Sequence, residues 1–110
     1  MTHGRVTPSK RLAAGLLLAA ATLPAAAQNA QALHTRALAA TCANCHGTEG
    51  RAVQNAAVPG LAGMPAAYMV EQLRTFKAGT RPATVMHQLS KGFSDAQIDQ
   101  IAAYFAAQRK

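Results

Sequence analysis

The sequence predicts a small all-α domain, for two reasons. Helix-forming residues with apolar side chains three or four positions apart recur along the chain, whereas no run of strand length alternates apolar and polar residues. The chain has 110 residues, which is enough for one domain. Half of its residues are apolar, but 27 are alanines and tryptophan is absent, so few large side chains are left to fill a core. We therefore expect a further stabilising element besides the core.

Two segments in the first three quarters of the chain are expected to be helical. Residues 30–41 are rich in Ala, Leu and Gln, which are good helix formers. Residues 65–79 begin with a proline, which the first turn of a helix tolerates, and end at Gly79, a residue type that commonly terminates helices. Between these ends, large apolar residues recur at i, i+4 and i+7, as expected for one buried face.

A third helix is expected near the C-terminus, because Ser94-x-x-Gln97 has the spacing of a capping box. In this motif each side chain accepts a hydrogen bond from the other residue's backbone N–H. Apolar residues then follow on one helical face: Ile98, Ile101, Ala102 and Phe105.

The stretches between these helices are predicted to be loops. Residues 47–64 contain four glycines and Pro59. Residues 80–92 contain Pro82 and lack sustained periodicity. No strand is expected in either stretch.

The N-terminus is typical of a secretory signal peptide. Basic residues stand in Met1–Lys10, a twelve-residue apolar run follows in Leu12–Leu23, and Ala25-x-Ala27 supplies the small-x-small exit. An uncleaved membrane anchor is the alternative, but about twenty apolar residues are needed to span a bilayer as a helix. We expect cleavage after Ala27, export to the periplasm, a mature domain of residues 28–110 and no stable membrane insertion.

Charge and cysteine content exclude several classes of protein. The formal charge is +7, and removing residues 1–27 takes three basic residues away, which leaves eight against four acids, or +4. No basic cluster interleaved with aromatic residues is visible, so a nucleic-acid partner is not expected. Two cysteines are too few for a disulfide-dense scaffold or a four-cysteine zinc site. The stabilising element is therefore expected to be a cofactor.

The two cysteines stand in Cys42-Ala43-Asn44-Cys45-His46, which has the C-x-x-C-H spacing of a c-type haem attachment site. Cysteines three residues apart in one helical turn can reach two vinyl groups on one edge of the porphyrin. His46 then lies beneath the iron as the proximal ligand. The alternatives are a thioredoxin-like C-x-x-C, which would follow a strand that is not predicted here, and a coincidental match.

With this motif the sequence resembles the small bacterial class I cytochromes c, over nearly all of residues 30–110. It is similar to one haem domain of the dihaem high-potential periplasmic cytochromes and to the cytochrome subunit of flavocytochrome c sulfide dehydrogenase. The matching segments are Cys42 to Gly47, Pro59-Gly60-Leu61-Ala62-Gly63, Tyr68 to Gly79, Pro82 to Met86, Lys91-Gly92-Phe93 and Asp99 to Phe105.

The resemblance implies three to four helices wrapped around one covalently attached haem c with its iron. It implies an electron carrier rather than an enzyme, with low-spin six-coordinate iron and periplasmic redox proteins as partners. A flavoprotein dehydrogenase is one such partner, and this chain could be its haem subunit. A haem-free thiol–disulfide protein and a five-coordinate ligand-binding haem protein stay open as alternatives.

The distal axial ligand is expected to be Met86, chiefly because its position matches the ligating methionine of the resembled family. An axial methionine raises the reduction potential, which suits an electron carrier. Met69 stands on an apolar helical face and is expected in the core, while Met64 is only 18 residues past the axial histidine. His87 is a competing ligand, expected instead at the surface, and His34 has no ligand spacing.

The resemblance also assigns residues around the haem. The Pro59 carbonyl would accept a hydrogen bond from the axial histidine, an arrangement that fixes the ring and tunes the metal. Leu61 and Tyr68 would pack on the haem edge. Arg51 and Arg81 are candidates for pairing with the haem propionates.

Overall fold

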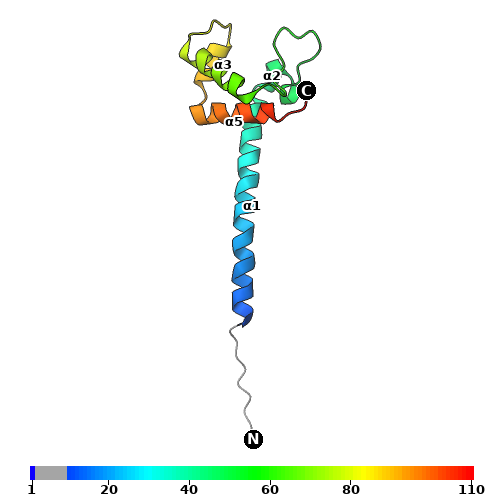
Figure 1. Cartoon of the computed structure of the whole chain (residues 1–110), viewed down its shortest axis with the longest axis vertical. Coiled ribbons are helices and arrows are strands. Elements are labelled where there is room, and N and C mark those ends of the chain that lie inside the picture. The colour runs from blue at the N-terminus through cyan, green and yellow to red at the C-terminus, as the bar shows by residue number, and fades with distance from the viewer. Residues whose placement is uncertain (2–9) are drawn as a thin grey trace. The chain divides into compact units, whose positions relative to one another are not determined.

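A computed structural model describes residues 1 and 10–110, with side chains for residue 1 and residues 25–110 (Figure 1). It divides into two units, Met1–Ala32 and Leu33–Lys110, and the second unit contains the core and the candidate site. The basic segment predicted to begin the signal peptide includes Arg5, which lies outside the described residues.

Helices are the only regular secondary structure in the described part of the chain, and loops and turns connect them, which confirms the predicted all-α class. The helical elements are α1 (Lys10–Ala40), α2 (Ala43–His46), the 3-10 turn η1 (Thr48–Gly50), α3 (Ala66–Ala78), α4 (Met86–Lys91) and α5 (Asp95–Ala106). The helix predicted for residues 30–41 forms the C-terminal part of α1. No helix over the described residues is long and apolar enough to cross a membrane.

The core lies where α3 packs against α5, with the C-terminal end of α1 contributing Ala39. The four apolar residues predicted for one face of α5 are all buried: Ile98, Ile101, Ala102 and Phe105. Met69 on α3 is also buried and belongs to the same cluster. Because the remaining members are small or only half-buried, this core has few large, fully buried side chains.

The predicted ends of α3 and α5 are present in the structure. Ser94 and Gln97 form the expected capping box, with the Gln97 N–H donating to Ser94 Oγ over 3.2 Å and the Ser94 N–H donating to Gln97 Oε1 over 2.8 Å. Gly79 ends α3 in the left-handed conformation with a φ of 76°. Pro65 precedes the first residue of α3 and does not itself form the first turn.

One sequence prediction was wrong, since residues 80–92 contain the helix α4. Six residues make fewer than two turns, which is too short for an apolar periodicity to be visible in the sequence. Isolated helices of this length are unstable in water, and α4 is held by packing against α3. The four-residue α2 is also too short to be predicted from apolar periodicity, so the described chain has five α-helices where three to four were expected.

Candidate functional site

The two cysteines and His46 lie in one helical turn that follows directly on α1. The His46 N–H donates to the carbonyl of Cys42 over 2.9 Å, and the Gly47 N–H donates to the carbonyl of Ala43 over 3.0 Å. Both cysteines are free thiols; Cys42 is half-buried and Cys45 is exposed. The turn therefore presents two sulfur atoms and one imidazole within five residues.

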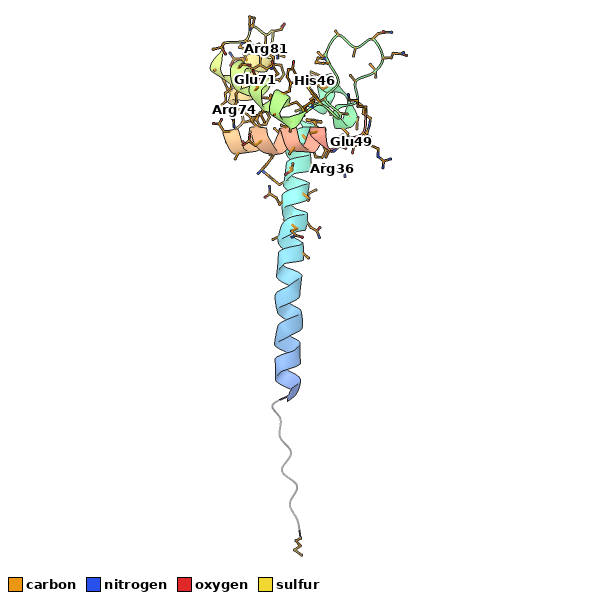
Figure 2. All side chains as sticks on the ribbon, in the orientation of Figure 1. Arg36, His46, Glu49, Glu71, Arg74 and Arg81 are labelled. Carbon is orange, nitrogen blue, oxygen red and sulfur yellow. The ribbon has the colours of Figure 1, made fainter. Side chains whose placement is uncertain are left out.

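His46, labelled in Figure 2, is a buried histidine with a fixed ring orientation. Its Nδ1 lies 2.7 Å from the carbonyl oxygen of Pro59, thirteen residues further along the chain. A carbonyl oxygen can only accept, so Nδ1 carries the hydrogen of the neutral ring and Nε2 keeps its lone pair. This is the contact implied by the resemblance, and it is the usual second interaction of a metal-bound histidine.

The loop that brings Pro59 to His46 folds back through two glycines. Gly47 has a φ of 83° and Gly50 a φ of 76°, a region that favours glycine. The carbonyl of Gly50 accepts hydrogen bonds from the backbone N–H groups of Leu61 and Ala62, over 2.8 and 3.1 Å. The loop is thus closed by its own backbone, and Pro59 stands two residues before this closure.

The pKa of the Cys42 thiol is raised above its usual range, mainly because the side chain is partly removed from water. A hydrogen bond with Thr41 opposes this effect, and the nearby Cys45 adds to it. Reactive thiols of redox proteins have lowered pKa values, since the thiolate is the nucleophile. The direction of the Cys42 shift is thus opposite to the one typical of reactive redox thiols.

The three candidate methionines have different surroundings. Met69 is 4% exposed and belongs to the core, and Met64 is half-buried and packs against the core. Met86 is also half-buried but is not part of that cluster, and it is the first residue of α4. Two of the methionines are thus used in packing, which leaves Met86 as the side chain available for another contact.

His87 differs from the expectation of a surface side chain. It is half-buried, and its Nδ1 is buried with no hydrogen-bond partner among the described residues. The difference arises from α4, whose buried side carries Met86, His87 and Ser90, while Val85 and Leu89 are each 52% exposed. His34 is exposed on α1.

Large apolar side chains are uncovered near these elements. Tyr68 on α3 is 48% exposed, and Leu61 is half-buried against the core. Val85 and Leu89 are also exposed. These four side chains leave apolar surface in contact with solvent, on a chain whose own core is small.

Two surface hollows lie on the described chain. One of about 500 Å³ adjoins the cysteine turn and is lined by Cys45 and by residues of the following loop, including Arg51 and Val53. The other, of about 510 Å³, lies along α3 and contains none of the site residues predicted from the sequence. Of these two hollows, the first adjoins the cysteine turn, and neither is lined by His46 or Met86.

Both candidate arginines have protein partners. Arg51 Nη1 lies 2.6 Å from Glu49 Oε2, and its Nε donates to the carbonyl of Arg109 over 3.1 Å. Arg81 donates to Gln72, and its guanidinium lies 4.6 Å from the centre of the Phe76 ring. Pairing with haem propionates stays a prediction for both.

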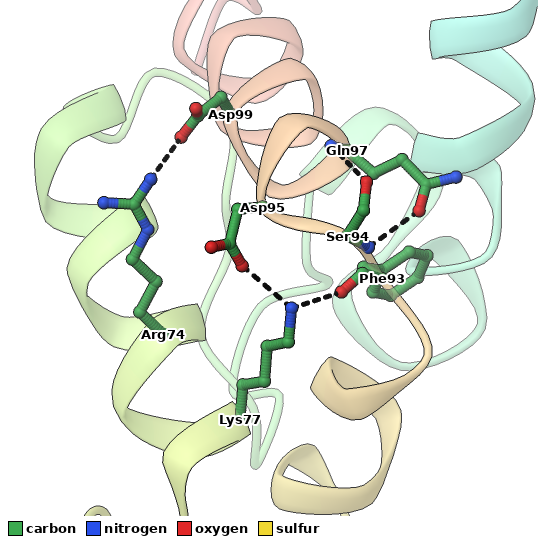
Figure 3. A network of polar contacts seen from close by, with 7 residues as sticks. All are labelled: Arg74, Lys77, Phe93, Ser94, Asp95, Gln97 and Asp99. Carbon is green, nitrogen blue, oxygen red and sulfur yellow. Dashed lines mark hydrogen bonds and ion pairs between the residues drawn. The ribbon is translucent and has the colours of Figure 1, made fainter.

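One polar residue near α4 was not singled out from the sequence. Lys77 on α3 donates to the carbonyl of Phe93 and to Asp95, each over 2.8 Å (Figure 3). Its partners are 16 and 18 residues away in the chain. Local sequence patterns do not predict contacts over that separation, so the hydrogen bonds of Lys77 are seen only in the packed structure.

These residues fit a covalently attached haem. Two free thiols three residues apart and an imidazole with an oriented ring and a free Nε2 are the groups that c-type haem attachment requires. A methionine outside the core and exposed apolar side chains are compatible with such a group.

Comparison with known proteins agrees with this chemistry. Residues 25–105 match the family model described as "Cytochrome C oxidase, cbb3-type, subunit III". The chain is 41% identical over 68 residues to the "Thiosulfate dehydrogenase electron acceptor" of Thiomonas intermedia, which covers 62% of this chain and 31% of that protein. It is 38% identical over 68 residues to the "Cytochrome subunit of sulfide dehydrogenase" of Chlorobaculum tepidum, covering 62% and 60% of the two chains.

A third relative is matched over most of its length. The chain is 35% identical over 71 residues to "Cytochrome c-554(548)" of Halomonas halodenitrificans, and the match covers 62% of this chain and 84% of that protein. By contrast, the chain spans only about a third to a half of the two thiosulfate dehydrogenase electron acceptors that it matches. The family model and these relatives together show that the chain belongs to the class I c-type cytochromes, haem electron-transfer proteins whose cofactor is covalently bound haem c with its iron.

Proposed function

We propose that this chain is a periplasmic electron carrier with one haem, in which Cys42 and Cys45 form the thioether bonds and His46 and Met86 are the axial ligands. The observation that carries this proposal is the hydrogen bond between His46 Nδ1 and the Pro59 carbonyl. It leaves Nε2 as the only free nitrogen of the ring, in the turn that also carries both cysteines.

The haem iron supplies the one-electron chemistry, and the residues of this chain fix its surroundings. Each cysteine thiol would add across one vinyl group, with sulfur bonding to one carbon and the thiol hydrogen passing to the other. The Pro59 carbonyl holds the His46 ring and makes its Nε2 a better electron donor. With haem bound, the ring would be held at Nδ1 by the Pro59 carbonyl and at Nε2 by the iron, so His46 would need to move little when the oxidation state changes.

The distal assignment is supported by the surroundings of the methionines. Met64 and Met69 pack in or against the core, whereas Met86 does not. A thioether ligand favours the reduced iron and raises the reduction potential, as electron carriers between dehydrogenases and terminal acceptors require. Leu61 and Tyr68 would cover the haem edge and exclude water from it.

Export is part of the proposal. The basic start, the twelve-residue apolar run and the Ala25-x-Ala27 exit favour cleavage after Ala27 and a mature domain of residues 28–110 in the periplasm. Attachment of haem to C-x-x-C-H in that compartment would then follow secretion. Mass spectrometry of the secreted protein tests the cleavage bond directly.

We propose dehydrogenases of reduced inorganic sulfur compounds as electron donors. This proposal rests on two relatives whose names state such a role, the thiosulfate dehydrogenase electron acceptor and the cytochrome subunit of sulfide dehydrogenase. The second relative also favours an alternative in which this chain is the haem subunit of a flavoprotein dehydrogenase. Stable co-purification with a flavoprotein selects the subunit; reduction by a dehydrogenase without a stable complex selects the free carrier.

The axial ligands are tested by optical spectra of the exported wild-type protein and of Met86→Ala. We expect low-spin ferric and ferrous spectra with the weak long-wavelength band of iron–sulfur ligation, and loss of that band in Met86→Ala. Met64→Ala is the matched control and should keep the band, because Met64 packs against the core. A high-spin wild-type protein that binds carbon monoxide would contradict the proposal, as would loss of the band in Met64→Ala alone.

A further inference from the structure

We propose that α3 positions Met86 by holding both ends of residues 80–93, here called the ligand segment, through Lys77 and Arg81. This inference rests on the proposed axial role of Met86. It assigns a positioning role to two residues that are neither proposed iron ligands nor haem attachment sites.

Lys77 holds the end of the ligand segment. Its Nζ donates to the Phe93 carbonyl and to Asp95 Oδ1, each over 2.8 Å, as Figure 3 shows. The backbone N–H of Phe93 donates in turn to the carbonyl of Ser90 over 3.3 Å, so Phe93 continues the last turn of α4. The ammonium group thus lies at the C-terminal end of α4, where the helix dipole favours a cation. It also joins this end to the first turn of α5 through Asp95.

Arg81 holds the start of the ligand segment. Its backbone N–H donates to the carbonyl of Thr75 over 3.2 Å, and the N–H of Thr80 donates to the same carbonyl over 3.0 Å. The Arg81 side chain donates to Gln72, and its guanidinium stacks on the Phe76 ring. The segment therefore leaves α3 in a fixed direction.

Between these two ends, polar side chains give the segment little support. Within the part of the chain that the structure describes, no side chain of residues 82–92 makes a hydrogen bond, and the buried His87 Nδ1 and Ser90 Oγ lack partners. The position of Met86 therefore depends on the packing of α4 against α3 and on the two end contacts. Weakening an end contact should let the sulfur move without unfolding the domain.

The structure offers a matched control for this inference. Arg74 and Asp99 form a second ion pair between α3 and α5, over 3.2 Å, which Figure 3 shows beside the first. Among the described residues, neither side chain of this pair makes a hydrogen bond with the ligand segment. Removing Arg74 or Lys77 takes away one α3–α5 ion pair in each case, but only the loss of Lys77 releases the Phe93 carbonyl.

The experiment compares Lys77→Met, Lys77→Arg and Arg74→Met with the wild-type holo-protein. The readouts are the long-wavelength iron–sulfur band of the ferric protein, the reduction potential and the affinity for cyanide, which competes with the methionine sulfur for ferric iron. We expect Lys77→Met to weaken the band, lower the potential and bind cyanide about tenfold more tightly, the size of effect that loss of a charge-assisted hydrogen bond gives. Arg74→Met should remain near the wild type, and Lys77→Arg should recover most of the difference.

The outcomes separate this inference from the proposed function. A wild-type protein without the iron–sulfur band overturns the proposed ligation. If the wild type shows the band but Lys77→Met and Arg74→Met change cyanide affinity equally, the positioning role of Lys77 is overturned. If Lys77→Met yields too little holo-protein, Lys77→Gln gives the same comparison, and Arg81→Gln tests the other end with the same expected direction.

Discussion

The two sides of the proposed haem site are built in different ways. On the His46 side, residues 42–63 are closed by their own backbone, with the Gly50 carbonyl accepting two hydrogen bonds. They are also joined to α5, since the Gly63 N–H donates to the Phe105 carbonyl over 2.9 Å. On the Met86 side, the ligand segment is attached to α3 at its ends, and His87 Nδ1 and Ser90 Oγ in its middle have no hydrogen-bond partner among the residues that the structure describes.

This difference indicates how the protein should respond to substitutions on each side of the site. The His46 side is determined by many backbone contacts and by glycine conformations that other residues rarely adopt, so a change there should affect the whole domain. The Met86 side depends on a few contacts from α3, so changes there should alter ligation before they alter folding. An electron carrier benefits from a fixed proximal ligand, while the distal ligand can be tuned by distant residues.

The largest effect is expected from Gly47→Ala, which should disrupt the packing of residues 42–63 on the His46 side. A Cβ at Gly47 would lie 2.0 Å from the Arg51 carbonyl oxygen, and the φ of 83° is unfavourable for alanine. We expect a loss of about 3 kcal/mol or more in the free energy of unfolding, since backbone atoms cannot move aside cheaply. Chemical denaturation of the holo-protein measures this loss.

Gly79→Ala is the control for that prediction. Gly79 also has a φ of 76°, but nothing lies within 4 Å of a Cβ placed there. It should cost only about 1 kcal/mol, from backbone conformation alone. Equal losses for the two variants would show that the close packing of residues 42–63 is unimportant.

A smaller effect of opposite sign is expected from Ser90→Ala in the ligand segment. Ser90 is fully buried, and its hydroxyl has no hydrogen-bond partner among the described residues. Removing an unpaired buried hydroxyl should leave stability unchanged or raise it by up to about 1 kcal/mol. Thermal unfolding followed at the iron–sulfur band measures both stability and ligation. A clear destabilisation would show that Ser90 has a partner, such as an ordered water, and that the segment is better supported than we infer.

The smallest effect is expected from Asp95→Asn, and it should depend on pH. The pKa of Asp95 is lowered, chiefly by the hydrogen bond and the charge of Lys77. A carboxyl whose folded-state pKa is lowered stabilises the protein above its unfolded pKa of about 4, and this stability is lost as pH falls through the folded-state pKa. Asp95→Asn should thus be less stable than the wild type at pH 6, with the gap closing towards pH 3.

Thermal denaturation at several pH values measures this gap. Repeating the substitution in a Lys77→Met background should make the gap smaller, because the main cause of the shift is then absent. A gap that persists unchanged at pH 3 or in that background would mean that the Lys77–Asp95 contact contributes nothing to stability.

Much of the fold was predictable because it is encoded locally. The capping box at Ser94 and Gln97, the glycine that ends α3 and the apolar face of α5 follow from short spacings and were all found in the structure. The helix α4 was not predictable, because six residues carry too little periodicity and their helix depends on α3. For the same reason, the burial of His87 was missed, since it follows from α4.

By itself, the sequence determined the class of the protein and the chemistry of its cofactor, since C-x-x-C-H confines two thiols and an imidazole to one helical turn. Only the tertiary structure decided which groups surround that turn. Pro59 meets His46 across 13 residues, and Lys77 meets Phe93 across 16. Contacts over such separations depend on how loops close and helices pack, which local residue patterns do not record.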